Sequence, residues 1–394
     1  MAQRYVGLIS GTSVDGVDAV LAEISAADFS ILCAATRPYP AELQCRVAAI
    51  IERPEVPLSE LGGLDAALGA FFAECALGVI ASAGLEPGDI EAIGHHGQTV
   101  YHAPVPPEAF TMQIGDPNVV AASTGVTTVA DFRRLDVALG GQGAPLVCAF
   151  HAWRFSAPAE TRAIVNIGGI ANITLLSPGS PVFGFDTGPG NTLLDRWIER
   201  EAAEPYDRNG EWAAGGRVDE ALLAGLLTDS YFAAAPPKST GRELFNLEWL
   251  ERHLTALGRP IAARNVQTTL AELTARTIAA AVHAAAPGCA RLIVCGGGAH
   301  NAHLLARLAA AGGMPVETTD AYGISPDWVE GAAFAWLAYA RLHGRPGNVP
   351  TVTGARQAAL LGGVYSGVSA HAHARCFGPL VGPDHSGHSE SQTA

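Results

Sequence analysis

One aspartate in this chain stands in surroundings that suit a catalytic carboxylate. Asp186 follows a short apolar run and precedes Thr187-Gly188-Pro189-Gly190-Asn191, so small residues leave its carboxylate uncovered. An open α/β sheet places its reactive groups at the carboxyl ends of its strands. The alternative role is that of a helix cap, because a helix is expected from about residue 190. Thr187 or Asn191 is better placed for capping, so we predict that Asp186 is catalytic.

Two stretches about one domain apart share a design that suits a bound phosphate. Apolar runs flank Gly11-Thr12-Ser13-Val14-Asp15-Gly16 in the first stretch and Gly168-Gly169-Ile170-Ala171-Asn172 in the second. Each stretch is typical of a β-hairpin whose turn leaves backbone N–H groups uncovered, and such groups form anion-binding nests. The two matched hairpins predict a duplicated fold that holds one polyphosphate from both sides.

A third glycine cluster indicates a nucleotide site. Gly296-Gly297-Gly298 follows the apolar strand 292–295 and precedes a helical pattern over residues 302–311. A strand, a glycine turn and a helix N-terminus let a nucleotide approach the backbone closely. A Rossmann fingerprint is the alternative, with Asp320 about where its acidic residue belongs. The cluster does not have the G-x-G-x-x-G spacing and comes late in the chain, which disfavours that alternative.

Carboxylates within the first glycine hairpin raise the question of a metal ion. Asp15 and Asp18 would repel a phosphate unless a cation lies between them, and Mg²⁺ held through water molecules would serve. The alternative is an Asx turn that stabilises the hairpin. For Asp15 the two interpretations are about equal, and for Asp18 the structural one is favoured. The identity of any metal ligand stays unknown at this point.

Two further polar segments are candidates for contacts with an acidic ligand. Arg133 and Arg134 are adjacent, so in an extended chain one reaches a cleft while the other meets solvent or Asp136. An arginine fork binds both oxygens of a carboxylate. His95 and His96 point apart on a strand, so a shared metal is disfavoured. One ring is expected to bond to a ligand or to a backbone carbonyl.

Composition places the chain among well-buried globular proteins. It has 394 residues, of which 48% are hydrophobic and 16% charged, which predicts two domains with large cores. The net charge of −14 argues against nucleic acid and against an anionic membrane as partners. The first residues run directly into a strand, without the pattern of a signal peptide. We therefore expect a cytoplasmic protein.

Apolar periodicity predicts an α/β chain in two halves. Helices are expected over residues 58–83, 190–203, 267–286 and 325–342, and the polar segment 131–143 is expected to cross between the halves and line a cleft. We expect one domain over residues 1–130 plus about 350–371, and a second over 131–349. Residues 372–394, rich in His, Ser and Gly, are expected to form a disordered tail.

These motifs together resemble the anhydro-N-acetylmuramic acid kinase family, and the resemblance runs from Val6 to about Val364. The shared segments are Gly11–Asp18, His96–Thr99, Gln113–Gly115, Asp131–Arg133, Gly140–Leu146, Asn166–Gly169, Phe185–Asn191, Lys238–Glu243, Cys295–Gly298 and Glu330–Gly331. The resemblance implies a two-domain actin-like ATPase fold, with a mixed sheet flanked by helices in each domain and the active site in the cleft between them. Leu135 and His95 depart from the family pattern, which leaves fine substrate contacts open.

The resemblance also implies residue roles and a reaction. Asp186 would be the catalytic base, and His96, Gln98, Arg133 and Glu330 would bind the sugar. ATP would be bound by Gly11, Thr12, Ser13, Val14, Asp15, Gly16, Val17 and Asp18, with Gly168, Gly169, Gly296, Gly297 and Gly298. With ATP and Mg²⁺, water would open the 1,6-anhydro bridge of N-acetylmuramic acid while O6 takes the γ-phosphoryl group, a step in peptidoglycan recycling.

Two other functions remain open from the sequence. One is a different sugar or acid kinase of the same fold, in which Asp186 deprotonates a hydroxyl group instead of water. The other is an ATP-switched binding protein without enzymatic activity, which would need an exposed partner surface or an added domain. No shift in composition marks such a domain. A homodimer is compatible with the sequence, which does not set the oligomeric state.

Overall fold

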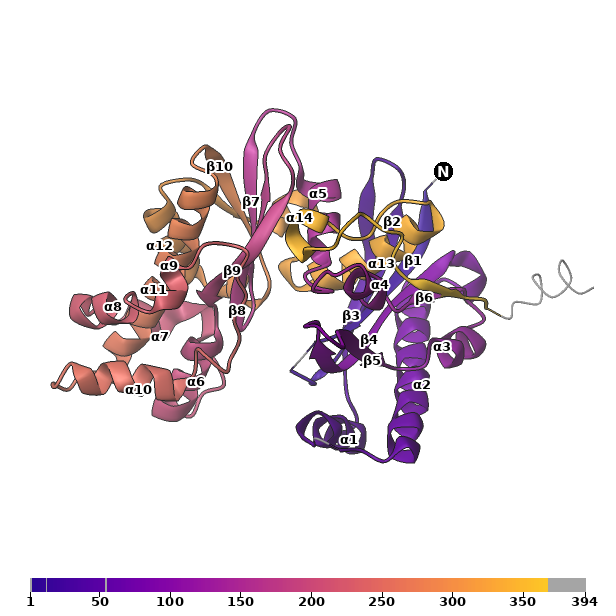
Figure 1. Ribbon diagram of the computed structural model, residues 1–394, viewed down its shortest axis with the longest axis horizontal. Coiled ribbons are helices and arrows are strands. Elements are labelled where there is room, and N and C mark those ends of the chain that lie inside the picture. Colours follow the sequence, from indigo (N-terminus) through magenta and orange to yellow (C-terminus); the bar gives the residue numbers. More distant parts are fainter. Residues whose placement is uncertain (1, 12, 54, 368–394) are drawn as a thin grey trace, which may run out of the picture.

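The chain folds into two α/β domains, each built on its own sheet (Figure 1). The computed structural model describes residues 2–11, 13–53 and 55–367. Thr12 and the predicted tail over 372–394 lie outside the described residues. The predicted fold class, two mixed sheets flanked by helices, is confirmed.

The first sheet has seven strands, six of them in the order β12-β6-β4-β1-β2-β3, with β5 paired to β4. Its strands are β1 (Gln3–Ser10), β2 (Gly16–Ile24), β3 (Phe29–Pro38), β4 (Ala92–Ala103), β5 (Phe110–Ile114), β6 (Thr128–Ala130) and β12 (Gly363–Tyr365). The helices of this part of the chain are α1 (Ala41–Glu52), α2 (Leu58–Ser82) and α3 (Pro117–Thr124), with a 3₁₀ turn, η1 (Pro87–Asp89).

The second sheet has five strands in the order β11-β10-β7-β8-β9. Its strands are β7 (Thr161–Ile167), β8 (Ile170–Leu176), β9 (Phe183–Pro189), β10 (Cys289–Cys295) and β11 (Val316–Thr318). The helices here are α6 (Thr192–Ala202), α7 (Glu211–Ala214), α8 (Glu220–Leu226), α9 (Ser230–Ala233), α10 (Leu247–Ala256), α11 (Ala263–Ala285) and α12 (Ala302–Gly312). The 3₁₀ turns are η2 (Arg208–Gly210), η3 (Gly297–His300) and η4 (Thr319–Tyr322).

The two sheets repeat one pattern. The order β6-β4-β1-β2-β3 corresponds to β11-β10-β7-β8-β9. In each sheet the first strand of the hairpin (β1 or β7) pairs antiparallel with the next strand along the chain and parallel with a later strand (β4 or β10). The duplicated fold expected from the two glycine hairpins is therefore confirmed.

Two helices lie between the sheets, and one of them moves a predicted domain boundary. α5 (Val147–Phe155) contacts β7 and β8, and it also packs on α13 (Val329–Leu342). α13 in turn covers β1, β2 and β4 of the first sheet, after a 3₁₀ turn, η5 (Pro326–Trp328). The expectation that the second domain runs to residue 349 is wrong for α13, because its apolar side is buried on the first sheet. Two short helices, α4 (Arg134–Ala138) and α14 (Pro350–Thr353), lie in the connecting segments.

Glycine on the first sheet lets α13 lie directly on the strands. Gly7 of β1 and Gly94 of β4 are register partners. A Cβ atom at Gly7 would overlap the carbonyl oxygen of Gly331, and one at Gly94 would overlap that of Phe334. The helix backbone therefore occupies the space that side chains would fill at these two positions.

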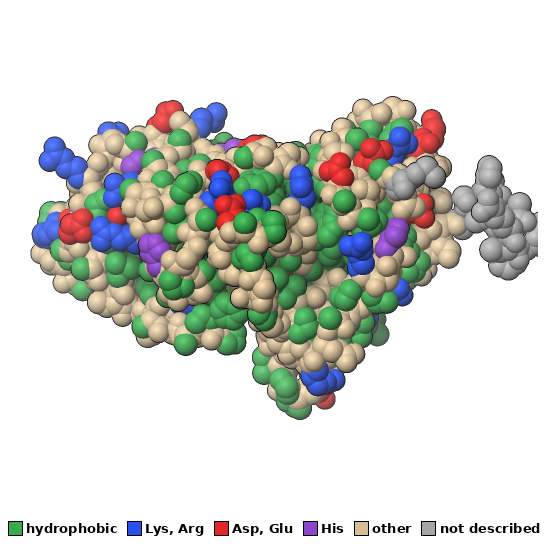
Figure 2. Space-filling model, turned by 90° about the horizontal axis from the view of Figure 1, so that it is seen from above, with side chains coloured by type: hydrophobic (Ala, Val, Ile, Leu, Met, Phe, Trp, Pro, Cys, Tyr) green, Lys and Arg blue, Asp and Glu red, His purple; other side chains and the backbone are tan. Residues whose placement is uncertain are grey.

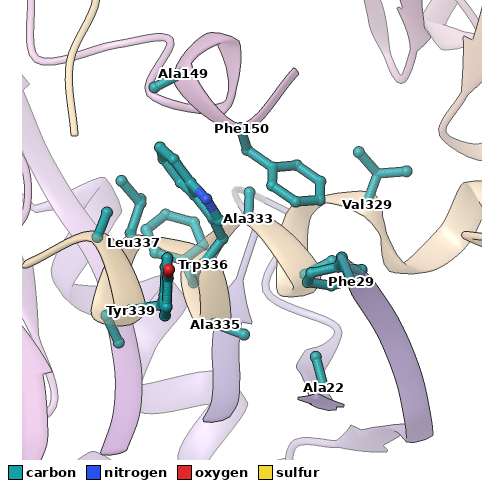
Figure 3. Close-up of a cluster of buried hydrophobic side chains, with 14 of the residues drawn as sticks. Ala22, Phe29, Ala149, Phe150, Val329, Ala333, Ala335, Trp336, Leu337 and Tyr339 are labelled. Carbon is teal, nitrogen blue, oxygen red and sulfur yellow. The ribbon is translucent and has the colours of Figure 1, made fainter. Parts of the chain in front are cut away.

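A single hydrophobic cluster joins the two sheets around α13. It includes Tyr5 of β1, Ile164 of β7 and Ile293 of β10, all fully buried. In Figure 3 Phe150 of α5 and Phe29 of β3 lie beside the α13 side chains, and the Phe29 and Phe150 ring centroids are 5.3 Å apart. The Phe150 and Trp336 ring centroids are 6.2 Å apart. The two domains thus share one core along this line.

α2 is long and apolar enough, by length and composition, to cross a membrane. The apolar window of this helix is 56% buried inside the molecule, where it packs against α1, α3 and strands of the first sheet. A core helix passes the same test, and its packing identifies α2 as one. On the face shown in Figure 2, acidic and basic side chains are scattered among apolar and neutral polar groups.

Candidate active site

The three glycine segments meet around one cavity between the domains. The cavity has a volume of about 390 Å³. The first domain lines it with Gly11, Ser13, Asp15, Gly16 and Asp18. The second domain lines it with Gly168, Gly296 and Gly297, which end strands β7 and β10 or follow them directly. Segments that are distant in sequence therefore converge as the glycine pattern predicts.

The first glycine turn is held open by an unusual backbone conformation. Val14 has a φ of 54°, in the left-handed region that a β-branched residue rarely adopts. Its side chain is buried, as is that of Val17, so these two residues anchor the loop in the core and offer a ligand only their backbone. The Oγ of Ser13 donates to Asp15 Oδ1 at 2.9 Å. Such a turn, with its N–H groups at the cavity, can bind phosphate oxygens.

Four carboxylates surround the same cavity: Asp15, Asp18, Asp327 and Glu330. Burial raises the pKa of Asp18, the hydrogen bond from Thr36 at 2.6 Å opposes that shift, and the charges of Asp15 and Asp327 add to it. In the described part of the chain, no group of three acidic, His or Cys side chains has the geometry to enclose a metal ion. Mg²⁺ fits this donor set through bound water and phosphate oxygens, with Asp15 and Asp18 nearest to the phosphate turn.

The second turn and the third glycine cluster brace each other. Asn191 donates from its backbone N–H to the Gly168 carbonyl at 2.8 Å and from its side chain to the Ile167 carbonyl at 3.1 Å. Gly296 has a φ of 76°, which favours glycine. Gly298 does not line the cavity. It is buried against Ile167, where a Cβ atom would collide, so its role is to pack η3 on β7.

Asp186 lies inside strand β9, and the predicted position at a strand end is wrong. Asp186 pairs with Asn172 while Gly188 pairs with Ala171, so Thr187 is an extra residue in the ladder. Such a bulge turns the strand locally and re-aims its side chains. The backbone N–H of Thr240 donates to Asp186 Oδ2 at 3.1 Å. Burial raises the pKa of Asp186 to about 6, against the lowering effect of that hydrogen bond.

We expect the turnover number to depend on the protonation of Asp186. A base must be unprotonated, and its pKa is raised to about 6, so kcat should fall as the pH drops below that value. The slope should be about tenfold per pH unit, as for one proton. Measuring kcat at saturating ATP and sugar from pH 5 to 8 tests this. The midpoint of the fall should lie within ~1 pH unit of 6. A flat kcat over this range would contradict the assignment.

Arg133 and Glu330 are the charged groups among the residues that the sequence predicts to bind the sugar. Arg133 donates from Nε to His96 Nε2 at 2.9 Å and from Nη1 to the Gly143 carbonyl at 2.7 Å. Burial lowers the pKa of Arg133 to about 10, and Glu330 and Asp136 oppose that shift, so the guanidinium stays charged at neutral pH. Glu330 lines the cavity. Desolvation by the surrounding protein raises the pKa of its carboxyl group, and the charge of Arg133 partly offsets that shift. Arg134 points away and pairs with Asp131 at 2.8 Å.

His96 and Gln98 support neighbouring groups instead of facing a ligand. His96 accepts from Arg133, so its Nδ1 carries the proton and donates to the Gly97 carbonyl at 2.7 Å, and burial lowers the pKa of the ring well below its usual value. Gln98 is fully buried. It accepts from Ser10 at 2.6 Å and donates to the Gly11 carbonyl at 3.3 Å, which fixes the start of the phosphate turn. Both ends of the Gln98 amide are thus bonded within the protein, and its predicted contact with the sugar stays a prediction.

A second cavity adjoins the third glycine cluster, and the sequence patterns do not point to it. It has a volume of about 450 Å³ and is lined by residues that include Asp195, Tyr206, Arg208 and Gly297. Tyr206 is exposed, with the Arg208 guanidinium 6.0 Å from its ring centroid. Burial raises the pKa of Asp195 to about 6, although Arg242 and Arg196 lower it. An aromatic ring, an arginine and a carboxylate beside a phosphate site suit a nucleoside.

Two further features lie near the first cavity, the one of about 390 Å³, and the sequence patterns gave neither of them a role. His151 of α5 is buried beneath it, with Nδ1 3.0 Å from Thr174 Oγ1, and within the described residues its Nε2 has no partner. The segment Lys238–Glu243 crosses β9 beside Asp186, where the Asp186 N–H donates to the Lys238 carbonyl at 3.3 Å. Both features depend on contacts between residues far apart in sequence, which local patterns do not reveal.

Size alone does not identify the site. A larger groove of about 970 Å³ lies beside the end of Asp186's strand, between Phe183, Phe232 and the alanines of α11. The three glycine turns are not among the residues that line it. The smaller cavity contains the groups that can bind phosphate, so we place the reaction there.

Two sheets of the same strand order, with glycine turns at a shared cavity, define a two-domain kinase of the actin-like ATPase class. The model of the anhydro-N-acetylmuramic acid kinase family matches residues 3–367. The chain belongs to this family. It is an ATP-dependent phosphotransferase that acts on 1,6-anhydro-N-acetylmuramic acid, and the function predicted from the resemblance is confirmed.

Solved structures show weaker likeness. An activator of 2-hydroxyisocaproyl-CoA dehydratase from Clostridium difficile has a TM-score of 0.45 and 13% identity, over 87% of this chain and 96% of that chain. Xylulose kinase from Rhodospirillum rubrum has a TM-score of 0.44 and 12% identity, over 86% of this chain and 90% of that chain. A ROK family glucokinase from Streptomyces griseus has a TM-score of 0.38 and 15% identity, over 86% of this chain and 99% of that chain. We base the fold class on the sheet topology and the family match.

Proposed function

We propose that Asp186 is the general base of this reaction and that it acts on water. Asp186 takes one proton from a water molecule, whose oxygen forms a bond to C1 of the sugar as the C1–O6 bond of the anhydro bridge breaks. The freed O6 forms a bond to the γ-phosphorus as the bond between that phosphorus and ADP breaks. The raised pKa of Asp186, about 6, supports this role, because a base near neutrality can accept and later release a proton.

We propose that the nucleotide binds across the cavity between the two glycine hairpins. Backbone N–H groups of the turn Gly11–Asp18, with Gly168, Gly296 and Gly297 at the cavity, would hold the phosphates. Gly169, next along the second turn, would support Gly168. The cavity at Asp195 and Tyr206 would take the nucleoside. Mg²⁺, near Asp15 and Asp18, would neutralise developing charge on the phosphoryl oxygens.

The sugar is proposed to lie between Arg133 and Glu330. Arg133 keeps its charge and would bind the lactyl carboxylate, while His96 and Gly143 hold the guanidinium in place. Glu330, at the start of α13, would accept from a sugar hydroxyl group. Gln98 would act indirectly, by holding Gly11.

Labelled water tests the proposed attack. In ¹⁸O-labelled water, quenched before the anomeric hydroxyl exchanges, the product should carry label at C1 and none in its phosphate. Mass spectrometry of the sugar phosphate and of its dephosphorylated form locates the label. Label in the phosphate would mean that water attacks phosphorus. No label at C1 would mean that a hydroxyl group is phosphorylated without ring opening by water, as in another sugar kinase of this fold, and would falsify the proposal.

The cellular setting follows from the substrate. 1,6-Anhydro-muramic sugars arise from cell-wall breakdown, so we propose a role in peptidoglycan recycling in the cytoplasm, where ATP is available. The net charge of −14 gives no support for nucleic acid or a membrane as partner. A homodimer stays a prediction.

A further inference from the structure

The segment Lys238–Glu243 connects the proposed base with the second phosphate turn. Lys238 is fixed at one end, where its Nζ donates to the Tyr231 carbonyl at 2.9 Å. Two residues further on, Thr240 donates its backbone N–H to the Asp186 carboxylate at 3.1 Å. The next side chain along the segment that carries charge is Arg242. The segment therefore sets the position of Asp186 and of Arg242 together.

Arg242 lies over the second glycine turn. Its Nε and Nη2 atoms are each 3.3 Å from the position that a Cβ atom of Gly169 would occupy. The guanidinium thus lies directly against the turn between β7 and β8, in tight contact with the position that a side chain at 169 would begin from. This turn is one of the two that we propose to hold the phosphates. Glycine at 169 leaves the room that Arg242 uses.

The charge of Arg242 is not neutralised by the protein. Among the described residues, no carboxylate oxygen lies within 4.0 Å of its guanidinium, whereas fifteen other ion pairs meet that limit. Its charge acts on Asp195, whose pKa it lowers. The side chain is exposed. An exposed guanidinium against the turn that follows β7, whose Gly168 lines the cavity, is suited to a multiply charged anion.

We infer that Arg242 contacts the phosphoryl group in transfer and stabilises the charge that develops on its oxygens. This inference rests on the proposed function, because it requires the γ-phosphoryl group to lie between the two hairpins. Arg242 shares its segment with the group that holds Asp186, so base and phosphoryl contact would be positioned by one stretch of chain. The alternative role is structural, as a partner of Asp195.

Substitution of Arg242 distinguishes these roles. In Arg242→Ala, kcat should fall by ~10²–10³-fold, the usual loss for one donor to a developing charge. The dissociation constant for ATP, measured by calorimetry, should change much less. Arg242→Lys keeps the charge but loses the two-pronged guanidinium, so its kcat should also be reduced. This variant replaces Arg242→Ala in the test if the alanine variant does not fold. Guanidinium chloride should partly restore Arg242→Ala, while sodium chloride at the same concentration should not.

Matched variants complete the test. Arg196 is exposed on α6 and pairs with Glu199 at 2.9 Å, so Arg196→Ala should leave kcat unchanged. If Arg242 served only Asp195, then Asp195→Asn and Arg242→Ala would both weaken ATP binding and leave kcat similar, which would overturn the inference. Normal kcat in Arg242→Ala would also overturn the inference about Arg242. The proposed function would be unaffected by that result, provided that the wild-type protein incorporates label at C1 in labelled water. Wild-type protein that does not convert the anhydro sugar would instead overturn the proposed function.

Discussion

Replacing Asp186 by Asn is expected to lower turnover by at least ~10²-fold while ATP binding stays nearly intact. The carboxamide keeps the shape of the side chain and can still accept from the Thr240 N–H, but it cannot take a proton from water. The measurement is kcat with the anhydro sugar, together with the dissociation constant for ATP by calorimetry. The second value shows that the cleft is folded.

A matched control uses the same substitution outside the cleft. Asp89 lies in the 3₁₀ turn η1, where its carboxylate accepts from the Glu86 N–H at 2.9 Å. Asp89→Asn should leave kcat unchanged. Near-normal turnover in Asp186→Asn would remove Asp186 from the mechanism, and equal losses in both variants would point to a general effect on the fold.

Replacing Gly94 by Ala should destabilise the protein by about 3 kcal/mol or more, the upper range for overpacking. The added methyl group would meet the carbonyl oxygen of Phe334, which is backbone and cannot rotate away as a side chain can. α13 would have to lift from the sheet. The free energy of unfolding from urea titration, with the midpoint of thermal unfolding, measures the effect.

Gly78 of α2 provides the opposite case. Apart from the adjoining backbone of α2 itself, no described residue has an atom within 4 Å of the position that its Cβ atom would take. Because alanine favours a helix over glycine, Gly78→Ala should stabilise the protein by up to ~1 kcal/mol. Equal stability of Gly94→Ala and the wild type would show that α13 does not rest on the glycines of the first sheet.

Local patterns predicted the elements of the fold well. The hairpins β1–β2 and β7–β8, the long helices α2 and α11, and the strand–glycine–helix unit of β10, η3 and α12 all lie where apolar periodicity placed them. These elements have short-range signals, because each hairpin or helix buries residues at its own spacing. The convergence of the three glycine segments followed from the duplication.

Long-range contacts explain what the sequence could not supply. The periodicity of α13 predicts a helix but not the sheet that it covers. The helix lies on Gly7 and Gly94, and these two residues become neighbours only when β1 and β4 pair. The resemblance of its motif to the family pattern predicts that Gln98 contacts the sugar. In the structure the Gln98 amide is hydrogen-bonded to Ser10 and to the Gly11 carbonyl. The bulge at Thr187 arises from pairing with β8, so strand periodicity alone misplaced Asp186.

The placement of α13 has a consequence for the order in which the newly made chain can fold. The second sheet is built from residues 161–318, a continuous stretch, and can assemble once that stretch has been synthesised. The first sheet begins with β1 at Gln3, yet the helix that covers β1, β2 and β4 is made only at Val329–Leu342, and strand β12 comes later still. Domains usually complete in the order in which they leave the ribosome. Here the N-terminal domain must wait, with an apolar sheet face uncovered, until every strand of the other domain's sheet has been made.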